Sequence, residues 1–167
     1  MMGRTPRAIL ACTAVSGTLD ILSAFVFGGM AGASPGRILR YVASGPFGDA
    51  MRDGGAGATA LGLGVHYGLM TIMATVFALA AQRLSILLRR PILSGAAYGL
   101  AIYTVMYWLV VPARFGRYPK LDAWSLGNAL FSHIVCVGIP MALVAAWLLN
   151  RAGSAAALPP MPARQVP

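Results

Sequence analysis

The stretch from Leu126 to Leu149 reads L-G-N-A-L-F-S-H-I-V-C-V-G-I-P-M-A-L-V-A-A-W-L-L and decides the fold class of the chain. It holds no Asp, Glu, Lys or Arg, and about 20 apolar residues in a helix are enough to cross the hydrocarbon core of a bilayer. Because lipid cannot pair with backbone N–H and C=O groups, a spanning segment of this kind must be helical. The stretch therefore predicts a transmembrane helix.

Three further apolar stretches of similar length precede it, near Ala8–Met30, Gly57–Ala81 and Ile92–Val111. The chain of 167 residues is 58% hydrophobic and 10% charged, with a mean hydropathy of +0.73, whereas a typical soluble domain is about 25% charged. We therefore predict an all-α, integral membrane four-helix bundle over residues 1–150. The tail of residues 151–167 is rich in Ala and Pro and is expected to be disordered.

The links between the predicted spans differ in length and composition. The link Arg83–Pro91 is short and carries three Arg, and its proline suits the first position of the next helix. The longer link Ala33–Gly55 predicts one short amphipathic turn on the membrane surface, followed by S-G-P-F-G-D-A-M-R-D-G-G, which is too rich in Gly and Pro for a regular helix. The link Pro112–Ser125 mixes basic and aromatic residues, as is typical of a membrane interface.

The net charge of +9 is spread over short basic clusters at the ends of the spans. Clusters in these positions are expected to meet lipid headgroups, and without a long basic run nucleic acid is not an expected partner. The N-terminal tail, the link Arg83–Pro91 and the C-terminal tail carry seven Lys and Arg, and the other two links carry six. The dense Arg cluster of the short link favours a topology with both termini in the cytoplasm.

The remaining composition bears on location. Cys12 and Cys136 both lie in apolar stretches, so no disulfide framework is expected. Twelve Arg against one Lys, with abundant Ala and Gly, are typical of a GC-rich bacterial genome, and the inner (plasma) membrane of a bacterium is the expected location. The run Ala8–Met30 is longer than the apolar region of about 7–15 residues in a signal peptide, and Asp20 interrupts it, so we expect a retained helix.

Asp20 is an acidic residue inside the first span, where a charged side chain costs about 2.5–3.5 kcal/mol on insertion scales. Steps of four along this helix place it in a row of small residues, and such a row allows a second helix to approach closely. We therefore expect Asp20 to point into the bundle. The row consists of Cys12, Ser16, Asp20, Ala24 and Gly28.

Both histidines of the chain also lie in predicted spans. His133 shares a helix face with Cys136, and Pro140 predicts a kink that frees a backbone carbonyl. With a rise of 1.5 Å per residue, Asp20, His66 and His133 are expected within about one helical turn in depth. His66 lies on a face for which small residues at every fourth position predict tight packing, in the rows Gly54, Ala58, Gly62, His66, Met70 and Ala60, Gly64, Gly68.

These three buried polar residues leave several functions open. One interpretation is that Asp20 and the histidines form interhelical hydrogen bonds, worth about 1 kcal/mol each. A second is a site for proton-linked transport or sensing, because Asp and His side chains relay protons in membranes. A third alternative is a membrane redox protein, in which His66 and His133 hold haem or a metal, with or without Asp20. No cofactor is otherwise predicted, because the sequence lacks CxxCH and HExxH spacings. No catalytic residue is predicted, and an enzyme is less favoured.

The third span carries a row of Gly95, Gly99, Tyr103 and Tyr107, with Tyr98 beside it. Tyr hydroxyls at membrane depth need hydrogen-bond partners. Either these side chains extend a polar network towards the first span, or they pack against the small residues of the second span. The second interpretation is favoured.

Four stretches of the chain form a recognisable pattern: Tyr41–Gly48 (Y-V-A-S-G-P-F-G), Gly54–His66, Tyr98–Pro112 and His133–Pro140. In these stretches the chain resembles a group of small bacterial inner-membrane proteins of unknown function. The similarity covers about residues 15–150, and it implies a four-span inner-membrane protein while leaving the activity open. The matched polar positions are again Asp20, His66 and His133.

A four-span unit of this length leaves little room for a solvated pathway of its own. If the protein transports a solute, a homo-oligomer or another membrane subunit is therefore an expected partner, beside the lipid bilayer. A purely structural or interaction subunit of a membrane assembly is the remaining alternative.

Overall fold

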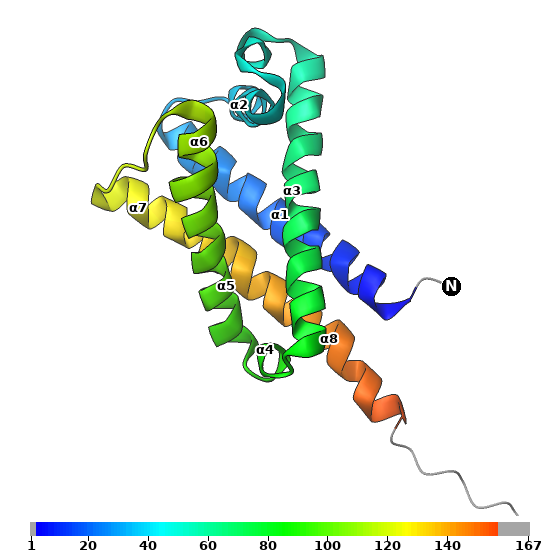
Figure 1. The fold of residues 1–167 in the computed structure, drawn as a ribbon. Helices are drawn as coiled ribbons and strands as arrows, with labels where there is room; N and C mark the ends of the chain where they lie inside the picture. The colour runs from blue at the N-terminus through cyan, green and yellow to red at the C-terminus, as the bar shows by residue number, and fades with distance from the viewer. Residues whose placement is uncertain (1–2, 157–167) are drawn as a thin grey trace, which may run out of the picture.

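Every regular element that the computed structural model describes is a helix (Figure 1). The described part of the chain is residues 3–156, with side chains described as far as Asn150. In chain order the elements are α1 (Arg4–Met30), α2 (Pro35–Phe47), the 3₁₀ helix η1 (Asp49–Asp53), α3 (Ala56–Arg83), α4 (Ile86–Arg89), α5 (Pro91–Val105), the π-helix η2 (Met106–Val110), α6 (Val111–Phe115), α7 (Ala123–Leu130), the π-helix η3 (Phe131–Gly138) and α8 (Ile139–Ala156).

Four continuous helical stretches are long and apolar enough to cross a membrane: Arg4–Met30, Ala56–Arg83, Pro91–Phe115 and Ala123–Asn150. The third runs through α5, η2 and α6, and the fourth through α7, η3 and α8. The predicted all-α fold with four apolar spans is confirmed. The structure extends each predicted span by a few residues, because the helices continue into the more polar ends of the links.

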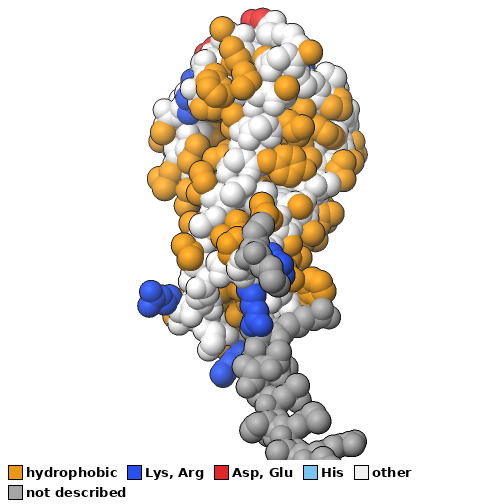
Figure 2. Space-filling model, turned by 90° about the vertical axis from the view of Figure 1, so that its right-hand side faces the viewer, with side chains coloured by type: hydrophobic (Ala, Val, Ile, Leu, Met, Phe, Trp, Pro, Cys, Tyr) orange, Lys and Arg blue, Asp and Glu red, His pale blue; other side chains and the backbone are white. Residues whose placement is uncertain are grey.

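The two ends of the bundle have different characters. In Figure 1, α2 and α6 lie at the upper end, while α4 and the visible end of α8 lie at the lower end. Figure 2 shows several Lys and Arg side chains at the lower end, both acidic and basic side chains at the upper end, and mainly hydrophobic side chains between them. Large apolar residues of the long helices, such as Val26, Ile72 and Leu109, are more than half exposed, as is expected for side chains that contact lipid.

Glycines bring the helix backbones together. A Cβ on Gly62 of α3 would overlap the carbonyl oxygen of Leu39 in α2, and one on Gly95 of α5 would lie 2.6 Å from the carbonyl oxygen of Gly138 in η3. Small residues at such contacts are the usual basis of helix association in a bilayer. The core beneath them includes Phe77 and Met141, which are 1% and 0% exposed.

The second small-residue row of α3 does not pack as expected. A Cβ on Gly64 or Gly68 would meet no heavy atom within 4 Å, and both residues are exposed. The buried face of α3 is the row with Ala58, Gly62 and His66. The row with Gly64 and Gly68 is offset by two residues from the row with Gly62 and His66, so the two rows lie about 160° apart around the helix axis and cannot both face the same neighbour.

The link between α1 and α3 also differs from its prediction. Instead of a short turn followed by an irregular segment, α2 is a helix of 13 residues that continues through Ser44, Gly45 and Pro46 to Phe47. Ser34 caps its N-terminus by accepting a hydrogen bond from the Arg37 backbone N–H. At the C-terminal end of α2, Arg114 of α6 donates hydrogen bonds to backbone carbonyls. The predicted start of a helix at Pro91 is confirmed.

The predicted C-terminal tail lies partly outside the described residues. Helix α8 continues past the predicted boundary at residue 150 to Ala156. Residues 157–167, to which the disorder prediction also applies, are outside the described part.

Candidate functional site

Asp20 and His66 meet between α1 and α3. The carboxylate Oδ2 of Asp20 lies 3.9 Å from Nδ1 of His66, and the two side chains are 17% and 8% exposed. This separation is too long for a direct hydrogen bond but places the two groups in close electrostatic contact. Of the charged and imidazole side chains predicted inside the spans, this is the pair that the structure brings together directly.

The protonation of the neutral His66 ring follows from its second contact. Nε2 lies 2.8 Å from the backbone carbonyl oxygen of Gly17 on α1. A carbonyl oxygen can only accept, so Nε2 carries the hydrogen and donates it. In the neutral ring Nδ1 is then an acceptor, and it is this nitrogen that faces Asp20. One proton can therefore be held either on the carboxylate or on Nδ1.

His133 has the opposite arrangement. Its Nδ1 lies 2.8 Å from the carbonyl oxygen of Ala129, one turn earlier in the chain. The hydrogen of the neutral ring is thus on Nδ1, and Nε2 is left as an acceptor. The π-helix η3 (Phe131–Gly138) carries His133 and ends two residues before Pro140. Single π-helical turns are frequent at functional sites, and this one directly precedes the helix segment that contains Pro140.

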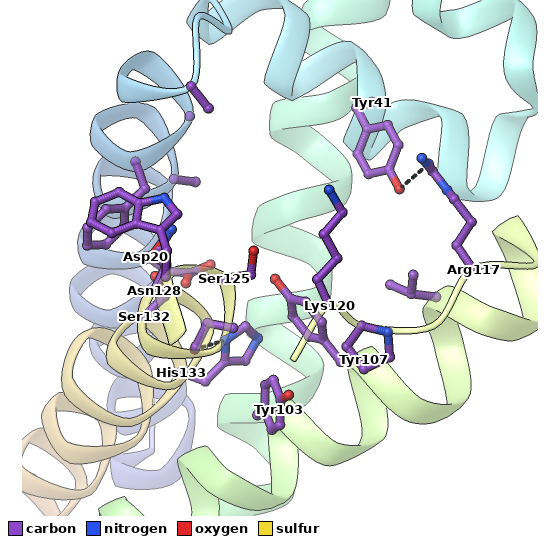
Figure 3. Close-up of a pocket in the computed structure, with 18 of the residues that line it drawn as sticks. Asp20, Tyr41, Tyr103, Tyr107, Arg117, Lys120, Ser125, Asn128, Ser132 and His133 are labelled. Carbon is purple, nitrogen blue, oxygen red and sulfur yellow. Dashed lines mark hydrogen bonds between the residues drawn. The ribbon is translucent and has the colours of Figure 1, made fainter. Parts of the chain in front are cut away.

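A cavity of about 800 Å³ connects Asp20 with His133. It lies between α1, the end of the third span, the following link and the fourth span, below the residue Tyr41 of α2. Figure 3 shows Asp20 and Ser132 on one wall, His133 and Tyr103 at the deep end, and Lys120 extending into the space. His66 does not line this cavity, so Asp20 has the imidazole of His66 on one side and the cavity on the other.

Hydrogen bonds between hydroxyl groups join α1 to η3 along one wall of the cavity. Ser23 donates to the backbone carbonyl of Asp20 at 2.8 Å, and its oxygen lies 2.8 Å from the hydroxyl of Ser132. Since the single hydrogen of Ser23 is used, Ser132 donates to Ser23. The backbone beside Asp20 is thereby joined to the helix segment that holds His133.

Aromatic side chains form much of the remaining cavity wall. Tyr103 and Tyr107 stack with ring centroids 5.0 Å apart, and His133 packs edge-on against Tyr107 with centroids 5.6 Å apart. Phe27 and Trp124 make a T-shaped pair at 6.1 Å nearer the mouth. Such faces are suited to a flat apolar group.

The mouth of the cavity is basic. Arg117 and Lys120 line it and are exposed. Arg117 donates to the Tyr41 hydroxyl at 3.1 Å, and neither cation forms an ion pair with a carboxylate among the described residues. The cavity therefore has two cations at its opening and one carboxylate, Asp20, inside it.

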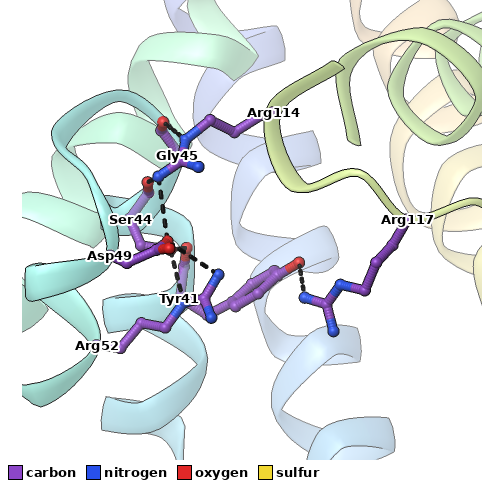
Figure 4. Close-up of polar contacts among 7 residues, drawn as sticks. All are labelled: Tyr41, Ser44, Gly45, Asp49, Arg52, Arg114 and Arg117. Atoms are coloured by element: carbon purple, nitrogen blue, oxygen red, sulfur yellow. Dashed lines mark hydrogen bonds and ion pairs between the residues drawn. The ribbon is translucent and has the colours of Figure 1, made fainter. Parts of the chain in front are cut away.

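Arg114 holds α2 above this cavity (Figure 4). Its guanidinium donates to the carbonyl oxygens of Gly45 at 2.6 Å and Ser44 at 2.8 Å, and it pairs with Asp49 at 3.2 Å. The last carbonyls of a helix lack partners within the helix, so these bonds cap α2. Tyr41 of α2 also stacks on Phe115 with ring centroids 4.9 Å apart.

Tyr98 and Tyr103 of the third span have different neighbours. Tyr98 donates to the carbonyl of Met73 on α3 at 2.8 Å, as packing against the second span requires. Tyr103 instead lines the cavity beside the fourth span, so the favoured packing interpretation does not describe it. Cys136 is buried and free, and Pro140 is half-buried.

The hypothesis of a metal site can be compared with the positions of the potential ligands. Among residues 3–150, no three side chains of His, Cys, Asp or Glu come together as a metal-sized group. Asp20 and His66 are paired, while His133 meets Asp20 across the cavity that both adjoin.

Sequence reasoning missed Arg117, Lys120, Trp124 and Asn128 as site residues. The first three had been assigned only to the membrane interface, and their position at a cavity mouth depends on how the link 116–122 folds back over the bundle. A polar residue such as Asn128 near the start of an apolar span was the one available signal.

Comparison with protein-family models, with curated proteins and with solved structures finds no match to this chain. The class of protein is therefore defined by its own structure. Four apolar helices of spanning length are those of a multi-pass membrane protein, and α1 together with the third and fourth spans lines an open cavity that holds Asp20 and His133.

Proposed function

We propose that this protein is a proton-linked membrane transporter or sensor in which Asp20 and His66 form the proton-binding site. The observation that carries the proposal is the placement of Asp20 between the acceptor nitrogen of a buried histidine and a cavity of about 800 Å³. A carboxylate at membrane depth that adjoins a cavity and an imidazole has the arrangement of a proton relay.

The geometry supports a definite path for the proton. A proton that enters through the cavity reaches the Asp20 carboxylate first, because this side chain lies between the cavity and His66. The proton then passes to Nδ1 of His66 when the 3.9 Å gap shortens to hydrogen-bond distance. His66 remains anchored throughout, because its Nε2 stays bonded to Gly17.

The proposed setting is the inner membrane of a bacterium, with both termini in the cytoplasm. The described basic residues at the end that holds the N-terminus and α4 are Arg4, Arg7, Arg83, Arg89 and Arg90. Three of these flank the short link between the second and third spans, the position where the positive-inside rule applies best. In this orientation the cavity opens to the periplasm. Membership in the family of small four-span proteins described above, and assembly as a homo-oligomer, belong to the same proposal.

Proton uptake by reconstituted vesicles tests the function. The protein is placed in liposomes that contain a trapped pH-sensitive dye, the external buffer is acidified, and potassium with valinomycin removes the membrane potential. We expect faster internal acidification than in protein-free vesicles. Asp20→Asn should reduce the rate to the protein-free level, since an amide cannot accept the proton, and His66→Gln should do the same.

Asp49→Asn is the matched control, because Asp49 is an exposed carboxylate at the same end and does not line the cavity. It should retain the wild-type rate. Wild-type acidification no faster than that of protein-free vesicles, or an Asp20→Asn rate equal to wild type, would overturn the proposal.

A purely structural pair is the second candidate, and one observation favours it. The 2.8 Å bond from His66 to Gly17 joins α3 to α1 and is buried, as expected for an interhelical hydrogen bond that stabilises packing. Thermal unfolding of Asp20→Asn separates the two functions. A structural carboxylate predicts a lowered Tm, whereas a proton site predicts an unchanged or raised Tm together with lost proton uptake.

A further inference from the structure

The cavity holds features that a proton site alone does not require. Proton binding needs Asp20, His66 and access to water. It does not need two unpaired cations at the opening or a wall of aromatic rings. We propose that the cavity binds a small organic anion with a flat, ring-sized apolar body, with its anionic group at Arg117 and Lys120.

The basic side chains at the cavity mouth are the first observation that supports an anion site. Of the basic side chains at this end, Arg52 and Arg114 both pair with Asp49, but Arg117 and Lys120 form no ion pair within contact distance among the described residues. In addition to the hydrogen bond from Ser125, Lys120 is close enough to the exposed Asp122 to lower the pKa of that carboxyl without contacting it. Arg117 is instead fixed by its bond to the Tyr41 hydroxyl. Its remaining guanidinium N–H groups are free to bind a carboxylate or phosphate oxygen.

The aromatic wall and the volume of the cavity are the second observation, and they support a flat, ring-sized ligand. Phe27 and Trp124 on one side and Tyr107 on another present ring faces and edges to the cavity. A volume of about 800 Å³ lies within the range of about 300–1,000 Å³ found for small-molecule sites. A lining of aromatic rings with a few polar groups suits a flat ligand that is apolar in the middle and charged at one end.

Asp20 supplies a link between the ligand and the proton. An anion in the same cavity repels an ionised Asp20, so a bound anion favours the protonated carboxylate, and a proton on Asp20 favours the anion. The titratable groups around Asp20 and its cavity are His66 of α3, Tyr103 of α5, Tyr107 of η2, and His133 and Cys136 of η3, with Tyr41, Tyr118, Arg117 and Lys120 further out. The only fixed cations among them are at the mouth.

This inference rests on the proposed function, because it names the substrate class of the same cavity. Together they describe a cavity in which a proton on Asp20 and an anion at the mouth each favour binding of the other. The same ligand chemistry has two sources: a water-soluble aromatic acid, or the headgroup of an anionic lipid that enters from the bilayer.

Calorimetric titration of 2-naphthoate into nanodisc-embedded protein tests the inference. Phosphatidylcholine nanodiscs are used, and the signal of empty nanodiscs is subtracted. We expect binding of 2-naphthoate and none of 2-naphthylmethanol, which has the same rings without the charge. Lys120→Gln and Arg117→Gln should each weaken binding roughly tenfold or more, the loss expected from one charge-assisted hydrogen bond.

Arg37→Gln is the matched control, because Arg37 is exposed at the same end of the bundle and does not line the cavity. It should bind as the wild type does, and Lys120→Arg should restore binding. Unchanged Tm values for the variants show that each is folded. Equal binding of 2-naphthoate and 2-naphthylmethanol, or equal losses in Lys120→Gln and Arg37→Gln, would overturn the inference.

A second arm identifies the source. With phosphatidylglycerol in the nanodiscs, a lipid headgroup at the site would compete and abolish naphthoate binding, and Lys120→Gln should then lose co-purified phosphatidylglycerol. Unchanged naphthoate binding supports a soluble acid. The pH dependence separates the inference from the proposed function. Naphthoate affinity that falls with rising pH in wild type but not in Asp20→Asn supports both, whereas pH-independent binding retains the anion site and rejects the proton site.

Discussion

Gly99 of α5 lies directly against the backbone of His133 in η3. A Cβ on Gly99 would overlap the His133 carbonyl oxygen and lie 2.7 Å from the Ile134 Cα. The helix segment that carries His133 is thus positioned by a backbone contact that only glycine permits. The neighbouring bond from His133 Nδ1 to Ala129 then fixes the direction of the ring.

Gly99→Ala should therefore be strongly destabilising. The obstructing atoms are backbone, which cannot rotate away, so we expect a loss of about 3 kcal/mol or more, the upper range for overpacked sites. Thermal unfolding in detergent measures the change. Gly64→Ala is the control, since its Cβ would meet nothing within 4 Å, and it should cause no loss. Equal Tm values for the two variants would contradict the packing of α5 on η3.

Arg114→Gln should release the end of α2. The variant loses two bonds from a charged group to carbonyls and the contact with Asp49, so we expect a loss of about 2 kcal/mol, within the range for hydrogen bonds to charged groups. Hydrogen exchange of the α2 amides should increase. Arg114→Lys should recover only part of the loss, because an ammonium cannot bridge several acceptors as the planar guanidinium does.

Arg89→Gln serves as the control for the Arg114 variants. Arg89 is exposed at the opposite end of the bundle, and its replacement should leave both the Tm and the exchange of α2 unchanged. Protection of α2 that does not depend on Arg114 would show that the guanidinium is not its cap.

The two histidines should be opposite tautomers when neutral. Nε2 of His66 and Nδ1 of His133 each face a carbonyl oxygen at 2.8 Å, and each must carry the hydrogen. Nitrogen-15 spectra of histidine-labelled protein can distinguish the two forms. The chain has only two histidines, so His66→Gln assigns both signals. A single shared tautomer would contradict one of the two hydrogen bonds.

Asp122 should contribute a pH-dependent part of the stability. It caps α7 by accepting a hydrogen bond from the Ser125 backbone N–H at 2.9 Å, and this bond holds the pKa of the Asp122 carboxyl below its ordinary value. Because the folded pKa is below the unfolded one, the contribution is fully present above the unfolded pKa and disappears as the pH falls through the folded pKa.

The difference in Tm between wild type and Asp122→Ala checks this expectation. It should be largest at neutral pH and shrink as the solution becomes more acidic than the ordinary titration range of Asp. A Tm difference that stays constant with pH would contradict the cap.

The proposed orientation can be tested with single cysteines. Both native cysteines are buried, so an introduced cysteine at an exposed position reports alone. In spheroplasts of a bacterial host, a membrane-impermeant maleimide should label Tyr118→Cys at once and Arg89→Cys only after lysis. The reverse pattern would show that the termini face the periplasm.

Much of the fold followed from composition along the chain. The four apolar stretches predicted the four long helices, and Pro91 predicted the start of the third. The burial of His66 also followed from its row of small residues. Each of these features depends on residues close in sequence, where helix geometry and the need to satisfy backbone groups in lipid leave few alternatives.

The predictions that were wrong, and the site residues that were not predicted, depend on contacts between residues far apart in the sequence. The helix α2 continues through Gly45 and Pro46, and its final carbonyls are bound by Arg114, about seventy positions later. Local composition alone indicated an irregular segment. Tyr98 packs against the second span and Tyr103 against the fourth, because the direction of each side chain depends on which helices flank the third span.

The sequence by itself determined four apolar helices of membrane-spanning length with ionisable groups inside three of them, because hydropathy acts along one dimension of the chain. The tertiary structure decided that Asp20 pairs with His66 rather than His133, and that Arg117 and Lys120 open onto the same cavity. Rotation of each helix about its axis and the path of the links set these relationships. They are fixed by close backbone contacts between helices, such as that of Gly99 with His133, which no single span contains.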